Sequence, residues 1–383
     1  MKMHGTARSA AIAATTALVA ALAACGGTTD AGSNEKADAA DVARYQERLD
    51  AWYEGTYKEP EAPVVKAPAG KDIWLVSSGM GVEYSVRVAE ASKQVAEELG
   101  WKVHVYDAKF DPNQMLTGVQ QAAVAGADGI VVGAIDCAIV TNAAKQAADA
   151  DIPIIGLESQ DCEPGLYAHN VSYAGKQPLN EWLTDFGRAQ AAWVIAATEG
   201  KAKVVMNTGT DTAATRTMAE GNKAELEECP TCEIVGDAKV VAADFGPKMQ
   251  EKVQQALTKA PRANAFIPSF DAVMTQSGGA QAVKSTGRME QLAVGGGEGT
   301  IAGIEQIRSG QGMEMCVGQS AEWEAYSAFD ALIRIFLDRD PAEADTGNGL
   351  QVCDKDHNLP EKGKPFTPDV DYAAAYHKLW SIG

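Results

Sequence analysis

From residue 71 onward, short continuous apolar runs alternate with longer segments in which apolar residues recur at helical spacing. Strands buried on both faces of a parallel sheet are apolar throughout, so the runs 73–76 and 129–133 predict strands. The segment 86–99 has the spacing of an amphipathic helix and is followed by Gly100, a common helix-ending residue. The same patterns predict further strands at 102–106, 153–157, 203–206, 234–241, 265–267 and 292–294. They predict further helices at 112–125, 139–150, 183–198, 215–228, 247–259, 276–285 and 301–309.

These strand–helix–strand units form two sets, and the second set begins near residue 183. Strands separated by helices of roughly 10 to 15 residues indicate parallel sheets with right-handed crossovers. We therefore expect an α/β fold with two doubly wound parallel-sheet lobes. In open parallel sheets, ligands bind beyond the carboxyl ends of the strands. Two facing lobes predict a ligand site in the cleft between them.

Two further segments lie outside these sets. Residues 41–57 have apolar and aromatic side chains at helical spacing, and the proline-containing stretch 58–70 is typical of a linker. After residue 358, several prolines precede a second helical pattern at 372–380. We expect both helical segments to pack on the lobes as additions to the core fold, and their role stays open.

The N-terminus indicates export. Lys2 and Arg8 precede an uncharged apolar run, 10–24, which is shorter than the roughly 20 residues of a membrane span but fits a signal-peptide core. The run ends in small residues followed by Cys25, an order that resembles the bacterial lipobox, in which the cysteine is lipidated. We expect a signal peptide over 1–24 and a lipid anchor at Cys25 as the only membrane attachment. An ordinary signal peptide with an incidental cysteine is the alternative.

Export makes the six other cysteines candidates for disulfides. Their connectivity stays open on sequence alone, and we expect the pairs Cys137–Cys162, Cys229–Cys232 and Cys316–Cys353. The second pair is a CxxC motif, which could instead be a redox pair. Redox pairs usually begin a helix, whose dipole favours the thiolate, whereas this pair follows a predicted helix. A structural clip is therefore favoured.

Composition narrows the classes of partner. The chain has 383 residues, of which 46% are apolar and 22% charged, which excludes a disordered chain and allows two domains. Its 33 basic and 52 acidic residues give a net charge of −19. Such a surface repels phosphate backbones, so no nucleic-acid partner is expected.

Motifs of catalysis are missing from the sequence. It contains no HExxH, no P-loop and no supported Ser/His/Asp arrangement, and the glycine-rich loop 295–300 lacks the lysine of a phosphate loop. No cluster with metal-ligand spacing is present either. We expect a protein that is not an enzyme and needs neither a metal nor another cofactor.

The order of these features resembles that of type I periplasmic binding proteins, of the ribose- and galactose-binding kind that serves ABC importers. The resemblance covers roughly residues 71–358 and rests on 74–78, 99–101, 110–115, 126–132, 150–155, 216–221, 243–245 and 295–303. It implies two lobes joined by a three-strand hinge, with crossovers near Ser172, Gln319 and Val352. The expected first lobe is 71–172 plus 320–350, the second is 173–319 plus 351–358, and 359–383 is an extension.

The resemblance also implies where a ligand would be contacted. In sugar binders an aromatic ring stacks on the sugar while polar side chains bind its hydroxyls. The corresponding positions here are Ser78, Glu83, Tyr84, Glu158, Ser159, Arg216, Phe245, Phe270, Asp271, Glu298 and Gln319.

Several of these positions have plainer interpretations. Arg216 has the planar fork that suits bidentate bonding, but it could pair with Glu220 instead. Tyr84 and Phe245 could be core aromatics, and Asp271 could cap a helix.

The implied function is a monomeric, extracytoplasmic lipoprotein, at the outer face of the membrane or in the periplasm. It would capture a small solute, with sugars favoured, and deliver it to an ABC permease after hinge closure. A receptor of the same fold that feeds a membrane signalling partner is the alternative. The family's usual Asp-Arg is Glu158-Ser159 here, and a usual Asn is Phe270, so an importer of a less polar, non-sugar solute is a further alternative.

Overall fold

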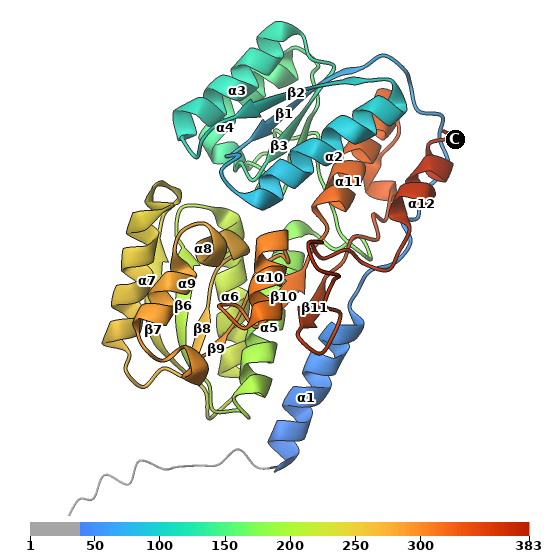
Figure 1. The fold of residues 1–383 in the computed structure, drawn as a ribbon. Helices are drawn as coiled ribbons and strands as arrows, with labels where there is room; N and C mark the ends of the chain where they lie inside the picture. The colour runs from blue at the N-terminus through green and yellow to red at the C-terminus, as the bar shows by residue number, and fades with distance from the viewer. Residues whose placement is uncertain (1–38, 383) are drawn as a thin grey trace, which may run out of the picture. The chain divides into compact units, whose positions relative to one another are not determined.

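The computed structural model describes residues 39–382 (Figure 1). The expected signal peptide and the lipidation site Cys25 lie outside the described residues. Among the residues that are described, no helix has the length and apolar character needed to cross a membrane.

The first lobe is built on a five-stranded sheet whose strands are parallel and follow the order β2-β1-β3-β4-β5. Alternate residues of a strand point to opposite faces, so Leu75 packs in a core with α2 and α11, whereas Val76 packs in a core with α3 and α4. The strands are β1 (Asp72–Ser77), β2 (Lys102–Asp107), β3 (Gly129–Gly133), β4 (Ile154–Leu157) and β5 (His169–Asn170). The helices are α2 (Glu83–Leu99), α3 (Pro112–Ala125), α4 (Cys137–Asp149) and α11 (Ala321–Phe336).

The second lobe repeats this plan around a parallel sheet of order β7-β6-β8-β9. Val204 packs in a core with α5 and α6, and its neighbour Val205 packs in a core with α7, α9 and α10. The strands are β6 (Lys203–Gly209), β7 (Glu233–Val240), β8 (Ala265–Ile267) and β9 (Ala293–Val294). The helices are α5 (Leu179–Ala197), α6 (Ala213–Glu227), α7 (Pro247–Lys259), α8 (Asp271–Thr275), α9 (Gly279–Ser285) and α10 (Ile301–Ser309).

One predicted helix was wrong in detail. The helix expected at 276–285 begins only at Gly279, as α9, because Gly278 before it adopts a left-handed conformation with φ of 76° that a continuous helix cannot include. A separate short helix, α8, precedes it at Asp271–Thr275. The loop 268–270 lies between the end of β8 at Ile267 and the start of α8. Three short 3₁₀ helices lie at Ala242–Asp244, Met289–Gln291 and Pro341–Glu343.

A small antiparallel sheet connects the lobes. β10 (Met315–Gly318) pairs with β11 (Gln351–Asp354), and between them the chain passes into the first lobe to form α11. Cys316 and Cys353 are register partners and form a disulfide. The other disulfides are Cys137–Cys162 and Cys229–Cys232, so the three bonds are the expected pairs.

Both helical extensions pack on the lobes (Figure 1). α1 (Ala39–Glu54) buries Tyr45 and Leu49 in the core that contains α5. α12 (Tyr372–Leu379) lies beside α11, where Tyr376 and the following Trp380 are buried. These contacts make the extensions part of the folded body.

Candidate functional site

The expected ligand-contacting side chains come from loops and helix starts that follow strands. Tyr84 is in the first turn of α2 after β1, Glu158 follows β4, Glu298 follows β9, and Gln319 follows β10. This is the edge at which open parallel sheets bind ligands.

Gln319 connects the two lobes at this edge. Its side-chain amide donates to the Tyr84 hydroxyl at 2.6 Å and to the Glu158 carboxylate. Its backbone N–H donates to the carbonyl of Glu298 at 3.1 Å. Residues from the first lobe, the second lobe and β10 are thereby brought to one point.

A small pocket opens beside this point on the first lobe, with a cavity volume of about 30 Å³. Tyr84 and Glu158 line it together with Glu324, a completely buried residue of α11 that sequence analysis did not identify. Tyr173 donates its hydroxyl to Glu324 at 3.4 Å. The signal for Glu324 was an acidic residue on the buried side of a mostly apolar helix, which is typical of a functional or paired group. Asp330, the other buried acidic residue of α11, is paired with Arg334.

The carboxyl groups around this point are strongly perturbed. Burial raises the pKa of Glu158 to about 7. Burial, followed by the charge of Asp271, raises the pKa of Glu298 to about 8. For Glu324, burial and then the charge of Glu158 raise the pKa well above its ordinary value. Ionised carboxyl groups this close together repel each other, so protons or a cation stabilise the cluster.

Asp271 holds the Glu298 loop. Its carboxylate accepts hydrogen bonds from the N–H of Gly297 at 2.8 Å and from the N–H and hydroxyl of Thr300 at 2.6 and 2.7 Å. Its own N–H donates to the Glu298 carboxylate at 2.7 Å. Asp271 is only 1% exposed, so its role in this structure is to position Glu298. A ligand contact from the Asp271 side chain stays a prediction.

Two more residues that are expected to contact the ligand have local hydrogen-bond partners in this structure. Ser159 is fully buried, and its hydroxyl bonds the carbonyls of Leu157 and Val132 and the N–H of Ile135, so it closes a turn. Arg216 is exposed and donates to the carbonyl of Thr210 at 3.1 Å, which also differs from the alternative pairing with Glu220.

Ser78 and the two phenylalanines lie around the same edge. Ser78 directly follows β1, is 8% exposed, and donates its N–H to the carbonyl of Gly133. Phe245 and Phe270 are partly buried against the second-lobe core. The Phe245 ring is 5.6 Å from the ring of Phe110, which belongs to the first lobe.

Two carboxylates of the first lobe bind helix N-termini of the second. Glu83 accepts hydrogen bonds from the N–H groups of Ile301 and Ala302, at 2.6 and 3.2 Å, where α10 begins. Asp136 accepts one from the N–H of Ala213, at 2.9 Å, where α6 begins. A carboxylate at a helix N-terminus is stabilised by the free N–H groups and by the helix dipole. Sequence analysis missed Asp136, because its partner lies 77 residues away along the chain.

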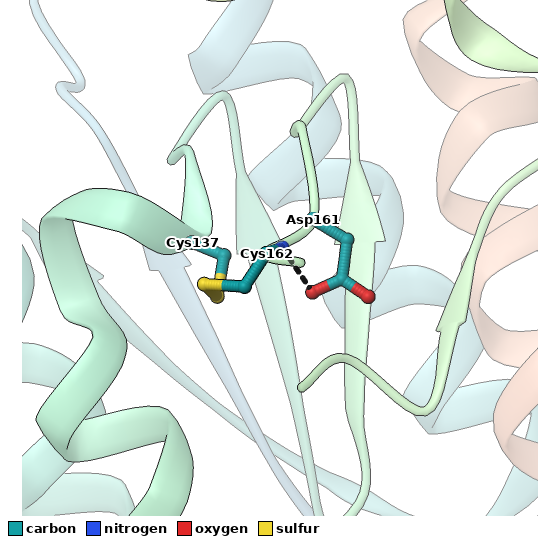
Figure 2. A group of neighbouring side chains, drawn as sticks. All are labelled: Cys137, Asp161 and Cys162. Atoms are coloured by element: carbon teal, nitrogen blue, oxygen red, sulfur yellow. Dashed lines mark hydrogen bonds between the residues drawn. A yellow bond between two sulfur atoms is a disulfide. The ribbon is translucent and has the colours of Figure 1, made fainter. Parts of the chain in front are cut away.

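One group of side chains has the composition of a metal site but the bonding of a structural one. Figure 2 shows Cys137, Asp161 and Cys162, with the two sulfurs joined in a disulfide. The Asp161 carboxylate accepts hydrogen bonds from the N–H groups of Cys162, Leu166 and Tyr167. Disulfide sulfurs are not thiolate ligands, so this group does not fit a metal ion.

Comparison with known proteins gives concordant results. Residues 73–339 match the family described as "Periplasmic binding protein domain". The ribose import binding protein of Salmonella typhimurium is 26% identical over 248 residues, which is 64% of this chain and 78% of that protein.

Solved structures show the same fold. A periplasmic solute-binding protein from Actinobacillus succinogenes with bound D-allose superposes with a TM-score of 0.64 at 20% identity, covering 75% of this chain and 98% of that chain. A glucose-galactose binding protein from Geobacillus stearothermophilus superposes with a TM-score of 0.64 at 21% identity, covering 76% and 100%.

Proposed function

Because the chain belongs to the periplasmic binding protein family, we propose that it captures a small polyhydroxylated solute between its lobes and delivers it to an ABC permease. The observation that carries the proposal is the position of Gln319, which bonds Tyr84 and Glu158 of the first lobe and the Glu298 loop of the second. A ligand placed there touches both lobes and therefore favours closure over it. The named relatives, which bind ribose, allose, glucose or galactose, support a sugar-like solute.

The ligand contacts in this proposal come from both lobes. Tyr84 offers an aromatic ring and a hydroxyl. Hydrogen-bonding groups come from Glu158, Glu298 and Gln319, and Glu324 of α11 adds a fourth polar side chain. Phe245 and Phe270 stand at the second-lobe side and supply apolar surface for the C–H face of a ring. Ser78 and Arg216 lie farther out as contacts of the open mouth.

The lobes in this proposal comprise 71–172 with 320–350 and 173–319 with 351–358, and they bend about crossovers near Ser172, Gln319 and Val352. The bonds of Glu83 and Asp136 to α10 and α6 belong to the closed arrangement. Opening breaks them and gives the solute access to the cleft.

The proposed location is outside the cytoplasm, with a lipid on Cys25 as the anchor. The protein acts as a monomer, and the solute passes to the permease chemically unaltered. No residue of the site is assigned a catalytic role.

The test is ligand binding by the soluble form that starts at Gly26. We expect thermal stabilisation by a small set of sugars, amino sugars and polyols, and X-ray scattering that shows compaction on binding. A ligand present at about 1,000 times its Kd stabilises a fold by roughly 4 kcal/mol, which a thermal scan resolves.

The matched variants test the site. Gln319→Ala should weaken binding strongly, whereas Gln311→Ala, an exposed position in the loop before β10, should leave it unchanged. Absence of binding to any compound of the panel, charged or neutral, would contradict the proposed function.

A further inference from the structure

The cleft contains more hydrogen-bond acceptors than donors. Glu158, Glu298 and Glu324 bring three carboxyl groups to it, and within residues 39–382 none of them forms an ion pair with a lysine or arginine. Arg87, on the neighbouring α2, is instead paired with Glu322 through two hydrogen bonds of 3.0 and 2.6 Å.

Two buried oxygen atoms in the cleft lack a hydrogen-bond donor. The Oε2 atom of Glu324 and the Oε1 atom of Gln319 have no hydrogen-bond partner, although these residues are 0% and 1% exposed. The Gln319 oxygen is an acceptor, and the Glu324 oxygen is an acceptor when its carboxyl group is ionised. The amide nitrogen of Gln319 is already engaged with Tyr84 and Glu158, which directs the side chain into the carboxyl cluster. A buried acceptor without a donor costs free energy, so the site is completed by a molecule that donates.

The surrounding groups engage Glu324 but leave the Gln319 oxygen without a donor. Tyr173 donates to Glu324 at 3.4 Å, and the side chains of Tyr84 and Glu158 form hydrogen bonds with Glu324 as well. The donors near Asp271 are used by Asp271 itself. Glu83 is bonded to the start of α10 and adds no donor. A sugar hydroxyl donates one hydrogen bond and carries no charge, whereas an ammonium donates three and neutralises a carboxylate.

We infer that the solute carries a protonated amino group beside its hydroxyls, as in an amino sugar or an amino-polyol, and that this group binds among Glu158, Glu298, Glu324 and Gln319. The inference rests on the proposed function and specifies the ligand class of the same site. Transferring a charge from water into a buried site costs free energy unless an opposite charge pairs with it there. In this site the ammonium and the carboxylates would each supply the opposite charge that the other needs.

The first experiment compares compounds that differ only in the amino group. Isothermal titration and thermal shift would use D-glucosamine against D-glucose and N-acetyl-D-glucosamine, and D-galactosamine against D-galactose, with the amino-polyol serinol against glycerol. At least one amine should bind at least about tenfold more tightly than its neutral counterparts, since a hydrogen bond to a charged group is worth about 1.5–3 kcal/mol.

The second experiment uses isosteric variants. Glu158→Gln, Glu298→Gln and Glu324→Gln keep an acceptor oxygen for the existing bonds but remove a negative charge, so each should reduce amine binding about tenfold or more. Glu220→Gln removes an exposed charge on α6 and serves as the control. Circular dichroism and thermal unfolding would verify that each variant folds.

Proton exchange gives an independent readout. Near pH 7 an ammonium favours the ionised carboxyl groups, so titrations in two buffers of different ionisation enthalpy should show proton release on binding. Tyr84 and Tyr173 face the same cluster, but burial holds the pKa of both hydroxyls well above the ordinary value, so they release no protons near pH 7. Asp271 and Glu83 are the other acidic groups beside the cluster.

The outcomes separate this inference from the proposed function. A neutral sugar that binds as tightly as every matched amine, or a panel in which only neutral compounds bind, would overturn the amine and leave the binding function intact. Failure of all amines at 10 mM would overturn it as well.

Discussion

The bonds of Glu83 and Asp136 to the second lobe give a sharp prediction for closure. The double variant Glu83→Gln, Asp136→Asn removes two negative charges from the N-termini of α10 and α6 while keeping acceptor oxygens. None of these atoms lies in the proposed ligand pocket. Any change in affinity therefore reports on the equilibrium between open and closed lobes.

The expected effect follows from the three bonds that are weakened. A hydrogen bond to a charged group contributes about 1.5–3 kcal/mol when buried. A charge at an exposed helix terminus contributes about 0.3–1 kcal/mol. Glu83 and Asp136 are partly exposed, so we expect a loss of about 2 kcal/mol for the pair. This corresponds to an increase of up to roughly thirtyfold in the apparent Kd, because only the closed population holds the ligand tightly.

The assay measures Kd and the dissociation rate by stopped-flow fluorescence, with X-ray scattering of the ligand-free protein. The matched control is Glu90→Gln, Asp149→Asn, which removes the same charge from exposed positions on α2 and α4. The double variant should dissociate faster and be less compact without ligand. If the double variant has the dissociation rate and the compactness of the wild type, or if the control loses as much affinity, the reasoning is refuted.

Three predictions concern stability. The folded chain holds protons on Glu158 and Glu298, with pKa values of about 7 and about 8, that the unfolded chain releases near 4.5. The Tm of the ligand-free protein should therefore fall as pH rises from about 4.5 to about 8, and Glu298→Gln should flatten this slope; an equal slope in the variant would contradict the assignment. Replacing both cysteines of the pair 316–353 by serine should lower the free energy of unfolding by about 4 kcal/mol, against about 2 kcal/mol for the pair 229–232, because the closed loops differ in length, with separations of 37 and 3 residues. Urea unfolding under oxidising conditions measures both, and equal losses would oppose the loop-length argument. Gly187→Ala should destabilise the fold by about 1–3 kcal/mol, because a Cβ at Gly187 would overlap the carbonyl of Met218 where α5 meets α6. Gly133→Ala should be tolerated, because the nearest atom to a Cβ at Gly133 is 4.0 Å away. Similar Tm values for the two variants would be evidence against the Gly187 contact.

The strands and helices could be predicted because their signal is local. A parallel strand is apolar throughout and an amphipathic helix has a fixed period, so 112–125 and 247–259 were predicted with the bounds that α3 and α7 have. The start of the helix expected at 276–285 was predicted too early, because the left-handed Gly278 precedes α9 without altering the apolar pattern.

The site could be predicted only in outline. The resemblance to the binding-protein family identified Tyr84, Glu158 and Gln319, which the structure brings together. It did not distinguish Ser159, whose neighbour Glu158 faces the cleft while its own hydroxyl bonds backbone. Adjacent residues in a loop can point in opposite directions, and no sequence period governs that choice.

The N-terminal extension is hydrogen-bonded to segments on both sides of the proposed hinge. α1 packs on the second lobe, and the linker that follows pairs with the segment before β11 through Thr56 with Leu350 and Glu61 with Asp345. The linker then donates from Val65 and Ala67 to the carbonyls of Leu379 and Trp380, beside α12 on the first lobe. The extension is thus bonded on both sides of the proposed hinge, so opening must either bend it near residues 55–61 or break these bonds. The free energy of bending the extension, or of breaking its bonds, therefore contributes to the equilibrium between open and closed lobes, as the bonds of Glu83 and Asp136 do. In the proposed arrangement a lipid on Cys25 holds the second lobe through α1, and the first lobe is the one that moves over the solute.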